Sequence, residues 1–210
     1  MDENYVVGID IGSSNVRVIT GELVETERIK LIGVADYPVE GMRKGEVTDP
    51  QKVNVSLRRA LEKAEKMAGV KIKGACISIT GAGMRSFDSE GVLTRQENSG
   101  ITSEEADYVT ENARKVPLPA DRTVVHMLEQ SFMIDGSEGV ENPVGMSGSR
   151  LERTVHIVTA VRRQVEALKD LLDWNGIELV KMVFAPFADA KVISGNTGEK
   201  ENGLLINIGG

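Results

Sequence analysis

The chain has few of the residues that mark several common protein classes. Its 210 residues include one cysteine, two histidines and 4% aromatic residues. Because Cys76 has no partner, a disulfide framework is excluded and a reducing compartment is expected. Cys76 stands in the strand-like run Gly74–Thr80, which predicts an inert thiol. His126 and His156 also lie in strand-like runs with no serine or cysteine in a nucleophile context, so we expect both to be structural.

Positive charge and long apolar runs are also scarce. The net charge of −7 and the pI near 5.1 argue against a nucleic-acid partner, because such proteins usually present a basic face. A basic pair such as Arg162-Arg163 is too short to form a nucleic-acid footprint. No run approaches the ~18 apolar residues of a membrane-spanning helix, and the first residues do not resemble a signal peptide. With 40% hydrophobic and 27% charged residues, the composition predicts a cytoplasmic globular protein of one domain or two small ones.

A short glycine-containing sequence occurs near both ends of the chain. Tyr5–Ser14 reads YVVGIDIGSS and Gly203–Gly210 reads GLLINIGG. In each copy an aliphatic run typical of a buried strand leads into a tight glycine turn. A strand followed by a glycine turn with small hydroxyl residues can present backbone N–H groups to a phosphate. Two such hairpins facing each other would form a nucleotide clamp, and the chain carries one hairpin and the first half of another.

The first hairpin has the composition of a phosphate loop. Gly12 permits a turn that aims three backbone amides outward, those of Ser13, Ser14 and Asn15. Asp10, at the end of the strand, is placed to hold Mg²⁺ through water, because hard cations keep several waters and take few carboxylates. The alternative is an ordinary β-hairpin whose turn happens to contain these residues.

The second copy differs from the first at one informative position. Asn207 takes the place of Asp10, and Gly209 and Gly210 complete the predicted cofactor-binding set. An amide keeps the shape of the carboxylate but loses the charge that would steer Mg²⁺ or polarise a water. We therefore predict nucleotide binding with slow or absent hydrolysis, and no catalytic residue is assigned.

Hydrophobic periodicity predicts an α/β order for the first third of the chain. The sequence predicts three strands in a meander, then a helix with a start signal at Asp49-Pro50 and a stop at Gly69, then a fourth strand. The predicted elements are Tyr5–Asp10, Val16–Leu23, Ile29–Tyr37, the helix Pro50–Ala68 and the strand Gly74–Thr80.

The pattern of polar and apolar residues changes in the middle of the chain, which predicts an inserted subdomain. Ser86–Asn98 is polar and hairpin-like, and Thr102 with Glu105 forms a capping box that opens a helix. Two long strands follow, Thr123–Ile134 and Leu151–Ala160, joined by the glycine-rich loop Asp135–Arg150. The order strand, helix, strand, strand predicts an α+β insert.

After the insert the α/β alternation resumes. The pattern predicts a helix over Arg162–Trp174, a strand over Ile177–Phe184, a short helix over Phe187–Ser194 and a polar linker over Gly195–Asn202. We also expect Trp174 to pack with Leu171 and Leu172. The predicted domains are residues 1–83 plus 161–198, the insert 84–160, and 199–210 as the start of a second α/β half.

Two loops carry a methionine among glycines. They are Gly41–Gly45, which reads GMRKG, and Asn142–Gly148, which reads NPVGMSG. Exposed methionine is an adaptable contact residue, and loops hold function more often than cores do. Simple glycine turns that each tuck in one methionine are the alternative.

These loops and the hairpins resemble the bacterial FtsA family over nearly the whole chain. The resemblance rests on VGIDIGSSNVRV (Val7–Val18), GMRKGEV, VPLPADR (Val116–Arg122), NPVGMSGSRLE (Asn142–Glu152) and VHIVTA (Val155–Ala160). Glycine hairpins of this type occur across actins, Hsp70 chaperones and sugar kinases, whereas NPVGMSG followed by RLE and VHIVT is much more particular.

The resemblance implies the N-terminal portion of an actin-like, ribonuclease H-like fold that binds ATP and Mg²⁺ and carries the insert. It implies a cell division adaptor that helps anchor and organise the FtsZ ring, assembles into filaments, and recruits later division proteins through the insert. The partner-binding candidates are Asn142, Pro143, Val144, Gly145 and Met146. It also implies, at most, a weak ATPase when full length, and a weak or absent ATP site in this chain alone.

The same resemblance places several family features beyond residue 210. These are the adenine pocket, the FtsZ-binding surface and a C-terminal amphipathic helix that would hold the protein on the inner face of the membrane at the division site. A pilus-assembly protein like PilM, which shares the fold, is the first alternative. A sugar or acid kinase on the same fold is the second, and it would need a catalytic Asp that we do not find.

Overall fold

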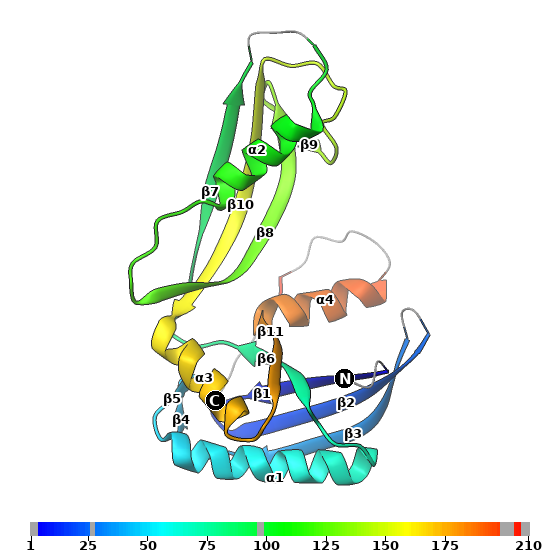
Figure 1. Cartoon of the computed structure of the whole chain (residues 1–210), viewed down its shortest axis with the longest axis vertical. Coiled ribbons are helices and arrows are strands. Elements are labelled where there is room, and N and C mark those ends of the chain that lie inside the picture. The colour runs from blue at the N-terminus through cyan, green and yellow to red at the C-terminus, as the bar shows by residue number, and fades with distance from the viewer. Residues whose placement is uncertain (1–3, 26–27, 96–98, 198–203, 207–210) are drawn as a thin grey trace. The chain divides into compact units, whose positions relative to one another are not determined.

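A computed structural model describes residues 4–25, 28–95, 99–197 and 204–206 of the chain (Figure 1). The chain divides into two compact units, and each is treated by itself below. Unit 1 comprises Met1–Gly83 and Val161–Gly210, and unit 2 comprises Met84–Ala160. The fold is mixed α/β, as the sequence predicts.

Unit 1 is built on a five-stranded sheet with the order β11-β6-β1-β2-β3. The meander of β1, β2 and β3 is antiparallel, whereas β6 pairs parallel to β1 and β11 pairs parallel to β6. The carboxyl ends of β1, β6 and β11 therefore lie at one edge of the sheet. The strands are β1 Tyr5–Ile11, β2 Asn15–Glu25, β3 Arg28–Pro38, β6 Gly74–Ile79 and β11 Glu178–Phe184.

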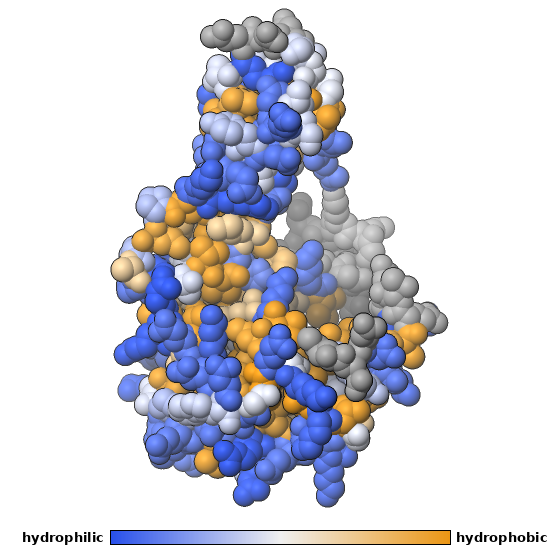
Figure 2. Space-filling view, viewed as in Figure 1, coloured by the Kyte–Doolittle hydropathy of each residue, from blue (hydrophilic) through white to orange (hydrophobic). Residues whose placement is uncertain are grey.

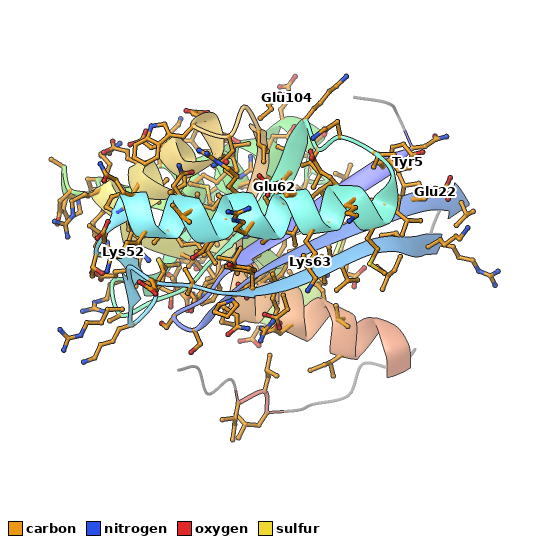
Figure 3. The ribbon with its side chains drawn as sticks, turned by 90° about the horizontal axis from the view of Figure 1, so that it is seen from below. Tyr5, Glu22, Lys52, Glu62, Lys63 and Glu104 are labelled. Carbon is orange, nitrogen blue, oxygen red and sulfur yellow. The ribbon has the colours of Figure 1, made fainter. Side chains whose placement is uncertain are left out.

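Helix α1, Pro50–Ala68, packs against β2 and β3 and begins and ends where the sequence predicts. The Asp49 carboxylate caps it by accepting from the Lys52 amide at 3.2 Å, and Gly69 ends it with φ at 72°. The buried stripe is Val53, Leu57, Ala60, Leu61 and Ala64. A Cβ on Gly33 of β3 would lie 2.8 Å from the Ala64 carbonyl oxygen, so glycine lets the helix lie close to the strand. The opposite face is charged, with Lys52, Glu62 and Lys63 exposed (Figure 3).

Smaller elements complete unit 1. A two-stranded hairpin of β4 Met42–Arg43 and β5 Glu46–Val47 precedes α1. Helix α3, Arg162–Asp173, packs against α1, β5 and β11, and helix α4, Ala185–Thr197, packs against β11. The α3 stripe Val165, Leu168, Leu171 and Leu172 is buried.

Unit 2 is a four-stranded sheet with the order β7-β10-β8-β9 and one helix. Its strands are β7 Arg85–Thr94, β8 Arg122–Ile134, β9 Ser137–Val140 and β10 Arg150–Val161, and its helix is α2 Ser103–Arg114. The predicted capping box is present, since the Thr102 side chain accepts from the Glu105 amide and Glu105 accepts from the Thr102 amide. Helix α2 lies so close to β7 that a Cβ on Gly91 would lie 1.9 Å from the Val109 carbonyl oxygen.

The structure corrects several predictions from sequence. Ser86–Asn98 was expected to be hairpin-like, but its described part is the single strand β7, paired along its length with β10. Alternating polar residues made this strand look like a hairpin because one face of the sheet is open. Helix α4 extends to Thr197, so the start of the expected linker is helical. Leu204–Ile206 belong to no strand and are exposed.

Two side chains near helix ends are more exposed than the helical spacing of apolar residues predicts. Trp174 is 53% exposed and Met67 is 65% exposed, although the helix residues beside them are buried. Both occupy the last turn of a helix or its cap, and the Met67 sulfur still accepts from the Val34 amide of β3 at 3.4 Å. Helical spacing identifies the face of a helix that meets the sheet but not how much of each side chain the sheet covers.

Candidate functional site

The candidate phosphate turn lies at the edge of the unit 1 sheet where β1 and β6 end. The β1–β2 connection closes tightly, since the Gly12 amide donates to the Asn15 carbonyl oxygen at 2.9 Å. A Cβ on Gly12 would lie 3.2 Å from that oxygen, which favours glycine. Ligands of open α/β sheets bind outside the carboxyl ends of the strands, so the turn lies where the fold class places its ligands.

Asp10 reaches the same edge and is held from two sides. Its carboxylate accepts a hydrogen bond from the Ser78 hydroxyl on β6, and its other oxygen lies 3.8 Å from the Arg17 guanidinium. The Asp10 side chain is 40% exposed. A carboxylate oriented by neighbours but still open to solvent can contact a hydrated cation.

The residues of the turn itself have different roles. The Ser13 hydroxyl accepts from the Gly45 amide at 3.0 Å, so this side chain ties the turn to the β4–β5 hairpin. The Asn15 side-chain amide donates to the Asp36 carboxylate on β3 and lowers the pKa of that carboxyl, with a further contribution from Arg17. Ser14 is exposed. Of the predicted hydroxyl and amide side chains, Ser14 is therefore the one that the turn leaves open to a ligand.

The β4–β5 hairpin places the GMRKG sequence next to this turn. Lys44 and Gly45 at its tip have φ of 52° and 77°, as in the two-residue turns with positive φ that suit hairpins. A Cβ on Gly45 would lie 2.8 Å from the Gly81 Cα atom, so two backbones meet there. Arg43 and Lys44 are exposed. This tip therefore brings two cations into the neighbourhood of the candidate phosphate turn.

Sequence reasoning missed two residues of this site. Ser78 orients Asp10, and Gln164 on α3 donates to the carbonyl oxygens of Gly45 and Thr80 at 2.8 Å each. Neither residue stands in a motif, and both come from segments far along the chain. The parallel pairing of β1 and β6 predicts a neighbour for Asp10, but the identity of that neighbour needs the register.

The second predicted half of the clamp, formed by Asn207, Gly209 and Gly210, lies outside the described residues.

The described residues fit a magnesium nucleotide on chemical grounds. The edge offers a tight glycine turn, a carboxylate open to solvent and nearby cations. No group of three or more His, Cys, Asp or Glu side chains that could hold a metal occurs in the part of the chain that the structure describes. Mg²⁺ suits such a site, because it is usually held by one or two carboxylates together with waters and phosphate oxygens.

In unit 2, the predicted partner-binding loop is held firmly by its backbone. The Gly145 amide donates to the Ile101 carbonyl oxygen and the Ile101 amide donates to the Met146 carbonyl oxygen, both at 2.8 Å. The Asn142 side chain accepts from the Val144 amide at 3.1 Å. Pro143 is buried, whereas Val144 and Met146 are 47% and 43% exposed. The loop presents two apolar side chains to solvent on a fixed backbone.

Two charged residues hold the chain where this loop leads into β10. The Arg95 side chain, which is 5% exposed, pairs with Glu105 at 2.8 Å and donates to the Gly148 carbonyl oxygen at 3.1 Å. Asp135 accepts from the hydroxyl and amide of Ser149, which lowers the pKa of its carboxyl. Charge-assisted hydrogen bonds therefore fasten the chain just after this loop, at Gly148 and Ser149.

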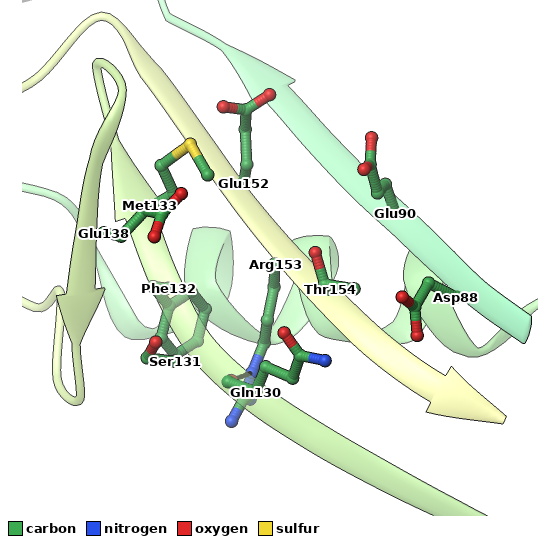
Figure 4. Close-up of a pocket in the computed structure, with 10 residues that line it drawn as sticks. All are labelled: Asp88, Glu90, Gln130, Ser131, Phe132, Met133, Glu138, Glu152, Arg153 and Thr154. Carbon is green, nitrogen blue, oxygen red and sulfur yellow. Dashed lines mark hydrogen bonds between the residues drawn. The ribbon is translucent and has the colours of Figure 1, made fainter.

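A separate hollow of about 340 Å³ lies on the unit 2 sheet (Figure 4). Four carboxylates line it, with one cation, Arg153, which is already paired with Glu129 at 2.9 Å. The carboxylates are Asp88, Glu90, Glu138 and Glu152. Like charges would repel a phosphate, so the electrostatics favour the unit 1 edge as the nucleotide site.

Comparison with solved structures identifies the class of fold. A chain of the PilM–PilN type IV pilus biogenesis complex superposes with a TM-score of 0.60 over 91% of this chain and 50% of that chain, at 14% sequence identity. At this identity the likeness concerns the fold alone. The protein has an actin-like fold with an inserted subdomain.

Sequence comparison then gives the family. Residues 81–159 match the family model described as the SHS2 domain inserted in FtsA. Cell division protein FtsA of Pseudomonas aeruginosa is 34% identical over 98% of this chain and 49% of its own length, and that of Escherichia coli strain K12 is 30% identical over 100% and 50%. The chain belongs to the FtsA family, and it spans about half the length of the curated relatives it matches.

Proposed function

We propose that this chain is the part of a bacterial cell division protein that carries the first nucleotide loop and the partner-binding insert. The observation that supports a division role is the match to FtsA proteins along nearly the whole chain. The likeness to the pilus complex is structural, so a role like that of PilM remains the alternative. No helix in the described segments has the length and apolar character needed to cross a bilayer.

The proposed ligand of unit 1 is ATP with Mg²⁺. The Ser13–Asn15 turn would contact phosphate oxygens through its backbone, and Asp10 would contact a water of the cation. The closed turn at Gly12 and the placement of Asp10 by Ser78 support this assignment. Because small-ligand sites typically bury ~70–90% of the ligand, one half of a clamp should bind ATP poorly by itself.

The protein is proposed to be a binding adaptor rather than an enzyme, with at most weak ATP hydrolysis. Asn207 carries this expectation, since it offers an amide where the first hairpin has a carboxylate. The full-length protein would act on the inner face of the cell membrane at the division site. FtsZ and membrane contacts would involve regions outside this chain, whereas filament contacts and later division proteins would involve the insert.

Within the insert, the proposed contact is the loop Asn142–Met146. Its support is the exposure of Val144 and Met146 on a backbone that is already ordered by hydrogen bonds. A partner binding there would lose little loop entropy on binding.

A titration of the full-length protein with Mg-ATP tests the nucleotide assignment. We expect Asp10→Asn to weaken binding at least about tenfold in Mg²⁺ and much less when Mg²⁺ is chelated, because the lost charge acts on the cation. Arg58→Gln, on the exposed face of α1, is the matched control that should leave affinity unchanged. Equal affinity of wild type and Asp10→Asn in both conditions would remove Asp10 from the site.

A pull-down of the full-length protein with the FtsZ C-terminal peptide tests the division role against the pilus alternative. Retention of the peptide supports the division adaptor. No retention of the peptide, together with retention of pilus-assembly proteins in a parallel pull-down, would overturn the division role.

A further inference from the structure

Gln164 is a polar residue in a buried place. It lies in the first turn of α3 with 6% of its surface exposed. Its Nε2 atom donates to the carbonyl oxygens of Gly45 and Thr80, at 2.8 Å each. Since an amide nitrogen has two hydrogens, both are used. The reversed amide would place Oε1 against two carbonyl oxygens, so these contacts fix the orientation of the side chain.

The other end of the same amide is not satisfied. Gln164 Oε1 is buried and has no hydrogen-bond partner among the described residues. A Cβ on Gly83 would lie 3.4 Å from this oxygen, so the chain passes close to it. An apolar side chain of similar size would avoid the cost of an unpaired carbonyl group. The role of the amide is therefore to hold the backbone of Gly45 and Thr80 in place.

Gly45 connects this amide to the candidate phosphate turn. Its carbonyl oxygen accepts from Gln164, and its own amide donates to the Ser13 hydroxyl at 3.0 Å. Hydrogen bonds thus run from Ser13 through Gly45 to Gln164 and on to Thr80. All of these residues belong to unit 1.

The far end of this hydrogen-bonded chain lies where the polypeptide enters and leaves unit 2. Residues 81–83 follow Thr80 and lead into unit 2, and residues 161–164 lead back from it. A Cβ on Gly83 would lie 2.9 Å from the Val161 side chain, so the outgoing and returning segments touch. A Cβ on Gly81 would lie 3.0 Å from Gln164 Nε2. The amide of Gln164, which belongs to the returning segment, therefore packs against the outgoing one.

We propose that Gln164 is a positioning residue for the phosphate turn and couples it, through Gly45, to the two segments that connect with the insert. The proposal rests on the nucleotide-binding function proposed above, because a bound phosphate would act on the Ser13 end of the hydrogen-bonded chain. A change at the turn would then alter the order of residues 80–83 and 161–164.

Hydrogen exchange of the full-length protein without nucleotide tests the coupling itself. In Gln164→Leu, which keeps the size but removes both donors, we expect exchange of the amides in residues 12–15 and of Gly45 to rise about tenfold. Glu166→Gln, exposed on the same helix, is the control and should change neither. A folded Gln164→Leu protein with wild-type exchange in residues 12–15 would overturn the proposal.

A second variant tests the Ser13 end of the hydrogen-bonded chain and leaves the buried Gln164 unchanged. Ser13→Ala removes the acceptor of the Gly45 amide and should raise exchange in residues 80–83, whereas Ser13→Thr keeps the hydroxyl and should not. If Ser13→Ala raises exchange only at Gly45, the chain of hydrogen bonds does not transmit and the proposal fails.

Measuring Mg-ATP binding distinguishes a failure of this proposal from a failure of the proposed function. Wild type should bind and show slower exchange in residues 80–83 and 161–164 on binding, and Gln164→Leu should bind about tenfold more weakly without that slowing. If wild type does not bind Mg-ATP, the proposed function fails, while the experiments without nucleotide still decide whether Gln164 positions the turn. Normal binding and normal slowing in Gln164→Leu would overturn the positioning role.

Discussion

The two units hold their exposed loops by different means. In unit 1 the candidate phosphate turn is held by neutral groups, mainly the Gly45 amide and the Ser13 hydroxyl, at an edge where parallel strands end. In unit 2 the loop Asn142–Met146 is held by backbone hydrogen bonds to Ile101, and the chain that follows it, residues 148–150, is held by the ionised side chains of Arg95 and Asp135. Parallel strands bring several chain segments to one edge, so backbone groups suffice there. In unit 2, charged side chains add to the backbone bonds where the chain enters β10.

The surfaces of the units differ as well (Figure 2). On the face shown, unit 2 is covered mainly by hydrophilic side chains, whereas apolar side chains gather on unit 1. Several exposed apolar residues of unit 1 lie on β2 and β3, including Ile19, Leu31 and Val34. Contiguous exposed apolar patches often mark surfaces that contact another protein.

The largest expected effect compares the two cores. Leu57→Ala in unit 1 and Leu151→Ala in unit 2 each remove a side chain with 0% exposure, and each should cost about 2–5 kcal/mol. If the units fold independently, calorimetry should show each substitution lowering a different transition. A single transition lowered by both would mean that the two units unfold together.

The next effect concerns the charged anchor of unit 2. Arg95→Ala removes a buried cation with several hydrogen bonds and should destabilise unit 2 by about 2–3 kcal/mol. Exchange of the Gly145 and Met146 amides should rise at the same time. Arg59→Ala, at an exposed ion pair on α1, is the control and should cost less than about 1 kcal/mol. An Arg95→Ala protein with an unchanged loop would remove the contrast between the units.

A smaller effect compares the two helix caps. Asp49→Ala and Thr102→Ala each remove a side chain that accepts from a helix amide, and each should cost about 1 kcal/mol. The Thr102 hydroxyl also donates to the Glu105 carboxylate at 3.2 Å, so Thr102→Ala loses two hydrogen bonds and should be the more costly of the two. Urea denaturation of each variant measures the difference, and the reverse order would contradict it.

The smallest effect is a pH dependence that should be stronger in unit 2. The Thr102 amide and Arg95 hold the pKa of Glu105 below its ordinary value of 4.5, and Ser149 and Arg150 hold that of Asp135 below 3.8. Because the folded-state pKa values are lowered, this stability is present above the ordinary values and lost as pH falls through the folded ones. The melting temperature of unit 2 should fall below about pH 4.5, and Asp135→Asn should flatten the dependence. An equally steep fall in Asp135→Asn would rule out this carboxyl as a source.

Local patterns were enough for most of the elements. Helix α1 was predicted at its observed ends because its cap residues and its apolar stripe agree, and the capping box located α2. The hairpin-like reading of Ser86–Asn98 failed because an alternating pattern does not say whether the partner strand is adjacent or far along the chain. Strand β7 pairs with β10, more than fifty residues away.

The candidate site was predictable only in part. The glycine turn and Asp10 stand together in one short motif, so their proximity followed from the sequence. Three other segments complete the site: Gly45 bonds to Ser13, Ser78 to Asp10, and Gln164 to Gly45. No local rule links these residues to the glycine turn. Asn207, Gly209 and Gly210 stay predictions.

By itself the sequence determined the family, the order of the elements and the glycine turn, because each depends on residues close together in the chain. Only the tertiary structure decided which strands share an edge and which side chains hold Asp10 and Ser13. The physical reason is that strand register and helix docking are set by burial summed over whole elements. A buried amide such as Gln164 acquires its role from the backbone groups that this packing places around it.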